Sequence, residues 1–140
     1  RLLRRQRQMC IRDRCGSDAL EEDPLSRLAL SNNAHWSVVA ALRPLSQRYL
    51  VLGGGGYHPW AVGRAWTGVW ATLTGAEIPD RLPPGAEAVL RGVPWTGHSR
   101  ARNPAPVLFT TLRDAPREGP VRGVVRDRLS ALTARLRVAV

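Results

Sequence analysis

The stretch Tyr49-Leu50-Val51-Leu52-Gly53-Gly54-Gly55-Gly56-Tyr57 decides the fold class of this chain. Its first four residues form a short continuous apolar run, which is the pattern of a strand buried on both faces. The four glycines end the strand and allow the backbone to turn sharply and to approach another group closely. A tyrosine is therefore presented at the carboxyl end of a strand, where the ligand sites of open α/β sheets lie.

Helical patterns lie on both sides of this strand in the sequence. Before it, residues 31–33 (Ser-Asn-Asn) offer N-caps for a helix that Pro44 stops. After it, Pro59 suits the first turn of a second helix, and Gly75 can cap the end of that helix. Helix, buried strand and helix in succession predict an α/β fold with a mostly parallel sheet.

The rest of the chain is less regular until its C-terminus. Residues 21–24 read as a polar loop, residues 78–84 as a proline-bounded loop and residues 95–107 as irregular structure. A final helix is predicted from apolar residues with helical spacing, namely Val121, Val124, Val125, Leu129, Leu132 and Leu136. Arg122, Arg126 and Arg128 lie off that apolar face, as expected for a solvated basic face.

The glycine turn is compatible with more than one chemistry. No Gly-Lys-Ser/Thr follows it, which excludes a Walker loop, and its glycine spacing does not fit a dinucleotide fingerprint. The hydroxyl of Tyr57 can donate a hydrogen bond to an oxygen that develops negative charge, and a tyrosine that merely packs is the alternative. Asp18 could be a metal ligand, although a single aspartate in such a sequence is more commonly a cap or turn residue.

The net charge of +10 raises the question of nucleic-acid binding. Residues 1–14 hold six arginines and one aspartate, and the remaining excess is scattered. Every basic residue is arginine, which indicates coding bias rather than selection for phosphate contacts. We therefore expect no nucleic-acid partner, and deleting residues 1–14 would test the alternative of a basic binding module. No apolar run of about 18 residues and no secretory signal is visible, so we expect no membrane association and a cytoplasmic location.

Residues 4–13 (RRQRQMCIRD) resemble the translation of a transposase adapter used to build sequencing libraries. On that interpretation residues 1–14 are not native and do not belong to the fold. A genuine basic arm is the alternative. Without this segment Cys15 is the only cysteine, so neither a disulfide framework nor a paired metal motif is expected.

Several motifs in register resemble the histone deacetylase superfamily. Residues 15–20 (CGSDAL) and 23–25 (DPL) are similar to its Gly-Ala-Asp motif and the loop that follows it. Residues 52–57 (LGGGGY) match its glycine-tyrosine motif, and residues 62–67 (VGRAWT) resemble its Val-Ala-Arg-Cys-Trp-Thr helix start. Residues 77–83 (EIPDRLP) follow at the expected place. The resemblance extends from residue 15 to about residue 84.

Two further stretches look more like the acetoin utilization branch of bacterial deacetylases, namely residues 58–60 (HPW) and 103–106 (NPAP). The resemblance implies that residues 15–113 are the C-terminal part of a deacetylase catalytic domain with an arginase-like open sheet. Residues 114–140 would then hold the C-terminal amphipathic helix.

The resemblance also implies an activity, which is metal-dependent hydrolysis of the acetyl amide of acetylated lysine in proteins. Asp18 would be one of the ligands of Zn²⁺, with Fe²⁺ as the other candidate metal, and Tyr57 would hydrogen-bond the tetrahedral oxyanion. Gly55 and Gly56 would shape the tunnel for the lysine stem, and Leu25 would line its rim. In this branch the implied substrate is an acetylated enzyme, with acetyl-CoA synthetase as the named candidate.

The chain departs from the family pattern in one large respect. The paired histidines and the Asp-x-His segment of the family have no counterpart in it, and His35, His58 and His98 are not in matching motifs. A catalytic zinc site normally needs three protein ligands, so we expect a truncated, inactive fragment. We also expect an exposed sheet edge and exposed tryptophans at positions 60, 66 and 70. An acetylpolyamine amidohydrolase and a non-enzymatic interaction module are the alternatives.

Overall fold

The structure is a computed structural model that describes residues 10–25, 27–97, 103–117 and 119–138. Its elements in chain order are β1 (Cys10–Cys15), the 3-10 helix η1 (Ser17–Ala19), α2 (Asn32–Leu42), the 3-10 helix η2 (Arg43–Leu45), β2 (Arg48–Gly53), α3 (Pro59–Thr74), α4 (Pro84–Gly92), α5 (Val107–Thr110) and α6 (Gly123–Val138). No helix within these ranges is both long enough and apolar enough to cross a membrane.

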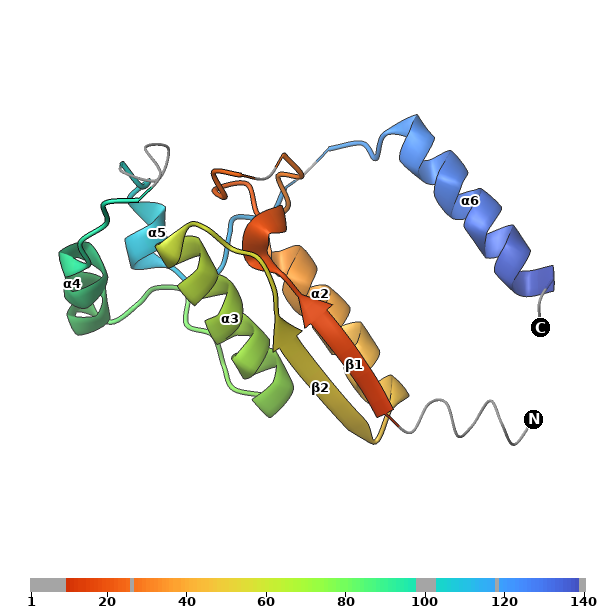
Figure 1. Ribbon diagram of the computed structural model, residues 1–140, viewed down its shortest axis with the longest axis horizontal. Helices are drawn as coiled ribbons and strands as arrows, with labels where there is room; N and C mark the ends of the chain where they lie inside the picture. Colours follow the sequence, from red (N-terminus) through yellow and green to blue (C-terminus); the bar gives the residue numbers. More distant parts are fainter. Residues whose placement is uncertain (1–9, 26, 98–102, 118, 139–140) are drawn as a thin grey trace.

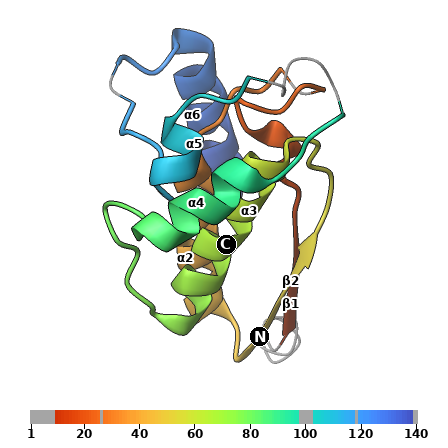
Figure 2. The ribbon, with the colours of Figure 1, turned by 90° about the vertical axis from the view of Figure 1, so that its left-hand side faces the viewer.

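The two strands form a parallel pair, with Cys10 opposite Arg48 and Cys15 opposite Gly53. Parallel neighbours need a crossover connection, and α2 provides it between β1 and β2. Helices α2 and α3 lie together on one face of this pair (Figures 1 and 2). The predicted α/β fold with a parallel sheet is confirmed.

Only one face of the sheet is covered by the described elements. Tyr49 and Val51 point toward α2 and α3 and pack against a core of Trp36, Val39 and Val69. On the opposite face Leu50 keeps 51% of its surface exposed. The prediction that this strand is buried on both faces is therefore wrong for this structure, because no described element lies against its second face.

Strand β1 falls inside the segment that we expected to lie outside the fold. Residues 10–15 pair along the whole of β2, because ladder hydrogen bonds join backbone groups and tolerate varied side chains. The alternation of the strand turns Arg12 and Arg14 to the exposed face.

A side-chain contact also joins the two strands. The Tyr49 hydroxyl donates to Asp13 Oδ2 at 2.9 Å, and burial together with this acidic partner raises the pKa of Tyr49 to about 12. The adapter interpretation stays a prediction, and residues 1–9 lie outside the described ranges.

The contact between α2 and α3 depends on Trp36. Its indole Nε1 donates to the carbonyl of Ala65 at 3.0 Å, which satisfies the one polar atom of a buried ring. A Cβ added at Gly68 would lie 1.8 Å from the same ring. The two helices can approach this closely because α3 has no side chain at position 68.

Polar side chains tie the start of α2 to the segment after α5. Asn32 Nδ2 donates to the Leu112 carbonyl at 2.7 Å, and Asn32 Oδ1 accepts from the backbone of Asp114 at 3.0 Å. Ser31 occupies the N-cap position without a side-chain cap bond. The helix thus begins where residues 31–33 predicted, but Ser31 does not cap it through its side chain, and Asn32 makes tertiary contacts instead.

A buried ion pair reinforces this connection. Arg64 of α3 is buried, lies 2.9 Å from Asp114 and donates through Nε to the Thr111 carbonyl at 2.8 Å. A buried charge is tolerated only when paired and hydrogen-bonded, and Arg64 satisfies both conditions. Residues 111–114 are therefore fixed to α3 as well as to α2.

Helix α3 begins and ends as predicted. Pro59 is its first residue, and Gly75 adopts the left-handed conformation at its C-terminus with φ of 74°. The expectation of awkwardly exposed tryptophans holds only for Trp70, because Trp60 is buried against Leu108 and Phe109. Trp66 is half-buried against the core beneath the sheet.

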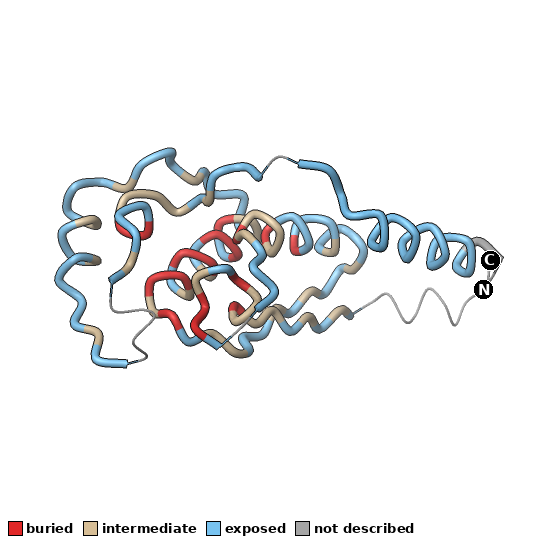
Figure 3. Tube along the Cα trace, turned by 90° about the horizontal axis from the view of Figure 1, so that it is seen from above, coloured by how far each residue is buried: buried red, intermediate tan, exposed pale blue. Residues whose placement is uncertain are grey.

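Helices α4 and α6 complete the comparison with the predicted helices. Helix α4 was not predicted, because its residues are exposed or half-buried and form no long apolar stripe. The expected C-terminal helix is present as α6, and its residues through 136 are exposed (Figure 3). The division of the chain at residues 14 and 113 stays a prediction.

Exchanging Gly68 for alanine tests the close contact between α2 and α3. We expect Gly68→Ala to lower the free energy of unfolding by about 1–3 kcal/mol, because the new methyl group overlaps the Trp36 ring. Gly63 lies on the same helix, and a Cβ there meets nothing within 4 Å. Gly63→Ala should stabilise by about 0.5–1 kcal/mol through helix propensity. Urea denaturation of both variants measures this, and equal effects would contradict the contact.

Candidate functional site

The carboxyl ends of the two parallel strands lie side by side and carry the predicted site. The backbone N–H of Ser17, at the start of η1, donates to the carbonyl of Gly55 at 2.7 Å. The Ser17 hydroxyl donates to the same carbonyl at 3.3 Å. These bonds hold the segment after β1 against the glycine segment after β2, as expected where parallel strands end at one sheet edge.

The glycines at positions 55 and 56 make room for this approach. A Cβ at Gly55 would lie 2.2 Å from Asp18 Oδ2, and a Cβ at Gly56 would lie 2.2 Å from the Ser17 hydroxyl. Gly56 also has φ of 154°, which side chains rarely adopt. A side chain at position 55 would displace the Asp18 carboxylate, and one at position 56 would displace the Ser17 side chain.

Asp18 is half-buried beside an open cavity of about 270 Å³. Ala19, Leu25 and Leu28 line the same cavity. The structure shows no hydrogen bond between the Asp18 carboxylate and the described residues, so its oxygens keep their acceptor capacity. The site therefore combines an available carboxylate with an apolar wall.

Asp23 connects the two halves of the site, and sequence reasoning missed it. Its side chain is 3% exposed, with Oδ2 accepting from the backbone N–H of Tyr57 at 2.7 Å. Its Oδ1 accepts from the backbone N–H of Leu25 at 2.9 Å. The Asp-Pro-Leu sequence is a signal for such a turn, in which an aspartate accepts from the residue two positions on. The predicted polar loop over residues 21–24 is thus partly buried.

Tyr57 and Leu25 are held through their backbones while their side chains face solvent. Tyr57 keeps 48% of its surface exposed, and Leu25 is also exposed. The structure therefore brings Asp18, Gly55, Gly56, Tyr57 and Leu25 to one end of the sheet. The roles assigned to these residues stay predictions.

His58 has a structural place next to this group. It is buried, it forms the N-cap of α3, and its Nδ1 accepts from the Ala61 backbone at 3.3 Å. Burial lowers the pKa of His58 from its usual 6.5, and the negative charge of Asp23 opposes this shift. Only the neutral ring can accept at Nδ1, so the cap and the lowered pKa agree.

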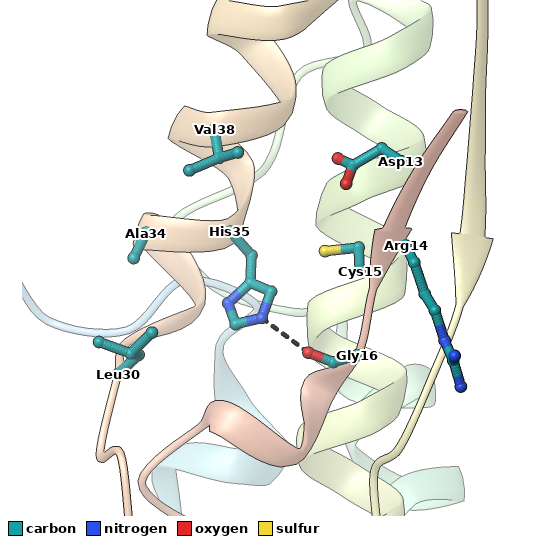
Figure 4. A pocket seen from close by; sticks show the side chains of 8 residues that line it. All are labelled: Asp13, Arg14, Cys15, Gly16, Leu30, Ala34, His35 and Val38. Atoms are coloured by element: carbon teal, nitrogen blue, oxygen red, sulfur yellow. Dashed lines mark hydrogen bonds between the residues drawn. The ribbon is translucent and has the colours of Figure 1, made fainter. Parts of the chain in front are cut away.

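A second cavity of about 230 Å³ lies between β1 and α2 (Figure 4). His35 Nε2 donates to the Gly16 carbonyl at 2.9 Å across it, and Cys15 lines its wall. Burial and the nearby Asp13 raise the pKa of the Cys15 thiol, which favours the unreactive protonated form. The hydrogen bond from His35 therefore positions the segment before Asp18, and the cavity contains no activated nucleophile.

The described residues do not by themselves fit a catalytic metal. No group of three or more histidine, cysteine, aspartate or glutamate side chains in the described ranges could hold an ion. Asp18 has suitable oxygens, but one carboxylate falls short of the three protein ligands of a catalytic zinc site. The geometry of this chain therefore supports no chemical step through a metal on its own.

Comparison with known proteins identifies relatives of this region. Residues 8–73 match the histone deacetylase domain family. The chain is 42% identical over 69 residues to putative histone deacetylase 2 of Caenorhabditis elegans, a match that covers 49% of this chain and 14% of that protein. It is 34% identical over 89 residues to histone deacetylase 1 of Oryza sativa subsp. japonica, covering 64% of this chain and 17% of the relative.

A solved structure extends the similarity to the fold. The crystal structure of an HDAC homologue from Aquifex aeolicus aligns with a TM-score of 0.73 and 35% sequence identity. The alignment covers 87% of this chain and 32% of that chain. This chain thus spans less than a third of the length of the relatives that it matches.

Removing the Asp23 carboxylate should loosen both halves of the site. We expect Asp23→Ala to speed hydrogen exchange at the Tyr57 amide and to cost about 1–3 kcal/mol of folding stability, since two backbone donors lose their buried acceptor. Exchange measured by NMR reports the amide directly. Asp18→Asn is the matched control, and it should leave the exchange rate at Tyr57 unchanged. Equal protection in the two variants would contradict the role of Asp23.

The buried His58 predicts a pH dependence of stability. Its pKa is lower in the folded than in the unfolded state, so the unfolded chain binds more protons below the usual 6.5. Stability should therefore fall as the pH drops below about 6.5. His58→Asn keeps a capping oxygen without the titration and should flatten this part of the profile. Denaturation midpoints of both proteins at several pH values measure this dependence. If stability falls equally steeply with pH in the variant, His58 is not the cause.

Proposed function

We propose that the chain contains part of a histone deacetylase superfamily domain and that its site serves metal-dependent hydrolysis of the acetyl amide of acetylated lysine. One observation carries the proposal. The Asp18 carboxylate and the Tyr57 segment follow two different strands and are held at one sheet edge by the Ser17–Gly55 and Asp23–Tyr57 hydrogen bonds.

Tyr57 is the proposed catalytic residue. When an amide carbonyl becomes tetrahedral, its oxygen gains negative charge that is absent from the ground state. A phenol positioned at that oxygen donates a hydrogen bond that strengthens as the charge appears. The buried Asp23 fixes the Tyr57 backbone, which sets the place from which the exposed ring extends.

The remaining residues would shape access to the site. Gly55 and Gly56 present backbone without side chains next to Asp18, which suits the narrow passage that a lysine stem requires. Leu25 borders the same cavity as Asp18 and is exposed, as a residue at the rim would be. Asp18 is the proposed metal ligand, and zinc, or iron in its place, is proposed from the family alone.

We expect no turnover from this chain by itself. The described residues offer a single carboxylate ligand, while His58 and His35 have structural roles at the start of α3 and beside Gly16. The proposed activity therefore belongs to a site that this chain completes in part.

The substrate and branch form a finer part of the proposal. Residues 58–60 and 103–106 favour the acetoin utilization branch, where the substrate would be an acetylated enzyme such as acetyl-CoA synthetase in the cytoplasm. An acetylpolyamine is the rival substrate. Comparing acetyl-lysine peptides with acetylated polyamines in one assay would separate these possibilities.

Grafting residues 15–97 into the matching segment of the Aquifex aeolicus homologue tests the proposal. We expect the chimera to hydrolyse acetyl-lysine peptides and Tyr57→Phe to reduce kcat by about 10²–10³-fold, because an oxyanion donor is lost. Tyr49→Phe removes the other tyrosine hydroxyl of the chain and should leave kcat unchanged. Full activity of a folded Tyr57→Phe chimera would overturn the assignment.

A further inference from the structure

Helix α6 carries a narrow apolar stripe, made of Val125, Leu129, Leu132 and Leu136, that nothing in the described structure covers. The three leucines each expose more than half of their surface. The helix stands apart from the sheet and its covering helices (Figures 1 and 3). We propose that α6 is a docking helix, which inserts this stripe into an apolar groove rimmed by carboxylates on a protein partner.

The spacing of the stripe fits a helix that lies in a groove. Its members follow each other at intervals of four, three and four residues, so at about 100° per residue they share one narrow face. Anchors at such intervals are the recognition pattern of an amphipathic helix in a hydrophobic groove. The stripe is confined to a single line of side chains, which matches a groove better than a broad surface.

Charge defines the rim of that groove. On the helical wheel Arg126 lies on one side of the stripe, and Arg128 and Arg135 lie on the other. All three side chains are exposed, and no acidic residue of the described helix shares this part of its surface. Guanidinium groups on both edges would meet carboxylates on both edges of a complementary groove, where paired N–H donors fix the register.

Two other occupants agree less well with these residues. Two copies of α6 packed through their stripes would face arginine against arginine, which disfavours self-association. A helix lying on a membrane needs a strongly charged outer face and aromatic anchors. The face of α6 opposite the stripe carries Asp127 among Ser130, Ala131 and Ala134, and the sequence of the helix contains no aromatic residue.

The apolar cavity between α3 and α4 on the same chain is also a poor partner. It measures about 510 Å³ and is lined largely by apolar residues such as Trp60, Val89 and Leu112. Among the described residues that line it, Arg64 alone is charged, so the cavity presents no carboxylate to the arginines of α6. This cavity therefore does not supply the complementary groove, and the proposal assigns that groove to a protein partner, independently of the deacetylase site.

Synthetic helical peptides of defined charge test the proposal on the full chain. The probe is a two-helix hairpin with a groove of leucines between its helices and glutamates along both edges of that groove, and a second hairpin peptide has lysines along these edges. We expect the chain to bind the glutamate peptide at least about tenfold more tightly than the lysine peptide in fluorescence anisotropy. Leu129→Gln/Leu132→Gln should weaken that binding more than about tenfold, because two apolar anchors are lost.

A charge-matched pair of variants completes the experiment. Arg128→Gln/Arg135→Gln should weaken binding several-fold and reduce its salt dependence, whereas Arg12→Gln/Arg48→Gln on the strands should change neither. The variants lie at exposed positions, so folding is not at stake. Equal binding of both peptides, or binding unaffected by the α6 variants, would overturn the proposal. So would α6-dependent binding to phosphatidylserine vesicles, or α6-dependent dimerisation in light scattering, in place of peptide binding.

Discussion

The close contact between the two segments that follow β1 and β2 is the constraint on which the site depends. The Ser17 amide reaches the Gly55 carbonyl at 2.7 Å, and the carboxylate of Asp18 occupies space that a side chain at position 55 would take. This approach requires glycine on one segment and a short turn on the other. The parallel pairing of β1 with β2 sets both segments at the same edge, and Asp23 then fixes Tyr57 relative to Leu25.

The packing beneath the sheet supports that edge from one side. Trp36 bridges α2 and α3 where Gly68 leaves space, so both helices are held against the inner face of the strands. The Arg64–Asp114 pair and Asn32 then fix the segment after α5 to both helices. These polar contacts are buried and mutually satisfied, which gives this region a specific arrangement as well as stability.

The described structure combines a well-packed core with apolar surfaces that none of its elements covers. The α2–α3 core is dense, while the outer face of the strands and the stripe of α6 remain exposed. Among the described residues Asp18 offers one carboxylate, whereas a catalytic zinc site normally needs three protein ligands. The structure thus presents one wall of a site and a separate helix whose chemistry points to a partner.

The sequence by itself determined the fold class and the position of the candidate residues at the carboxyl end of a strand. An apolar run, four glycines and a tyrosine specify a strand end, and Pro59 and Gly75 mark a helix, because these signals act through local backbone geometry. Only the tertiary structure decided what Asp23, Asn32 and His35 do. Their partners lie 19 to 82 residues away, at Gly16, Tyr57 and Asp114, and no local pattern encodes such distances. The one-sided burial of β2 likewise depends on which elements surround the strand. An apolar run favours burial, but it does not determine whether another element covers each face of the strand.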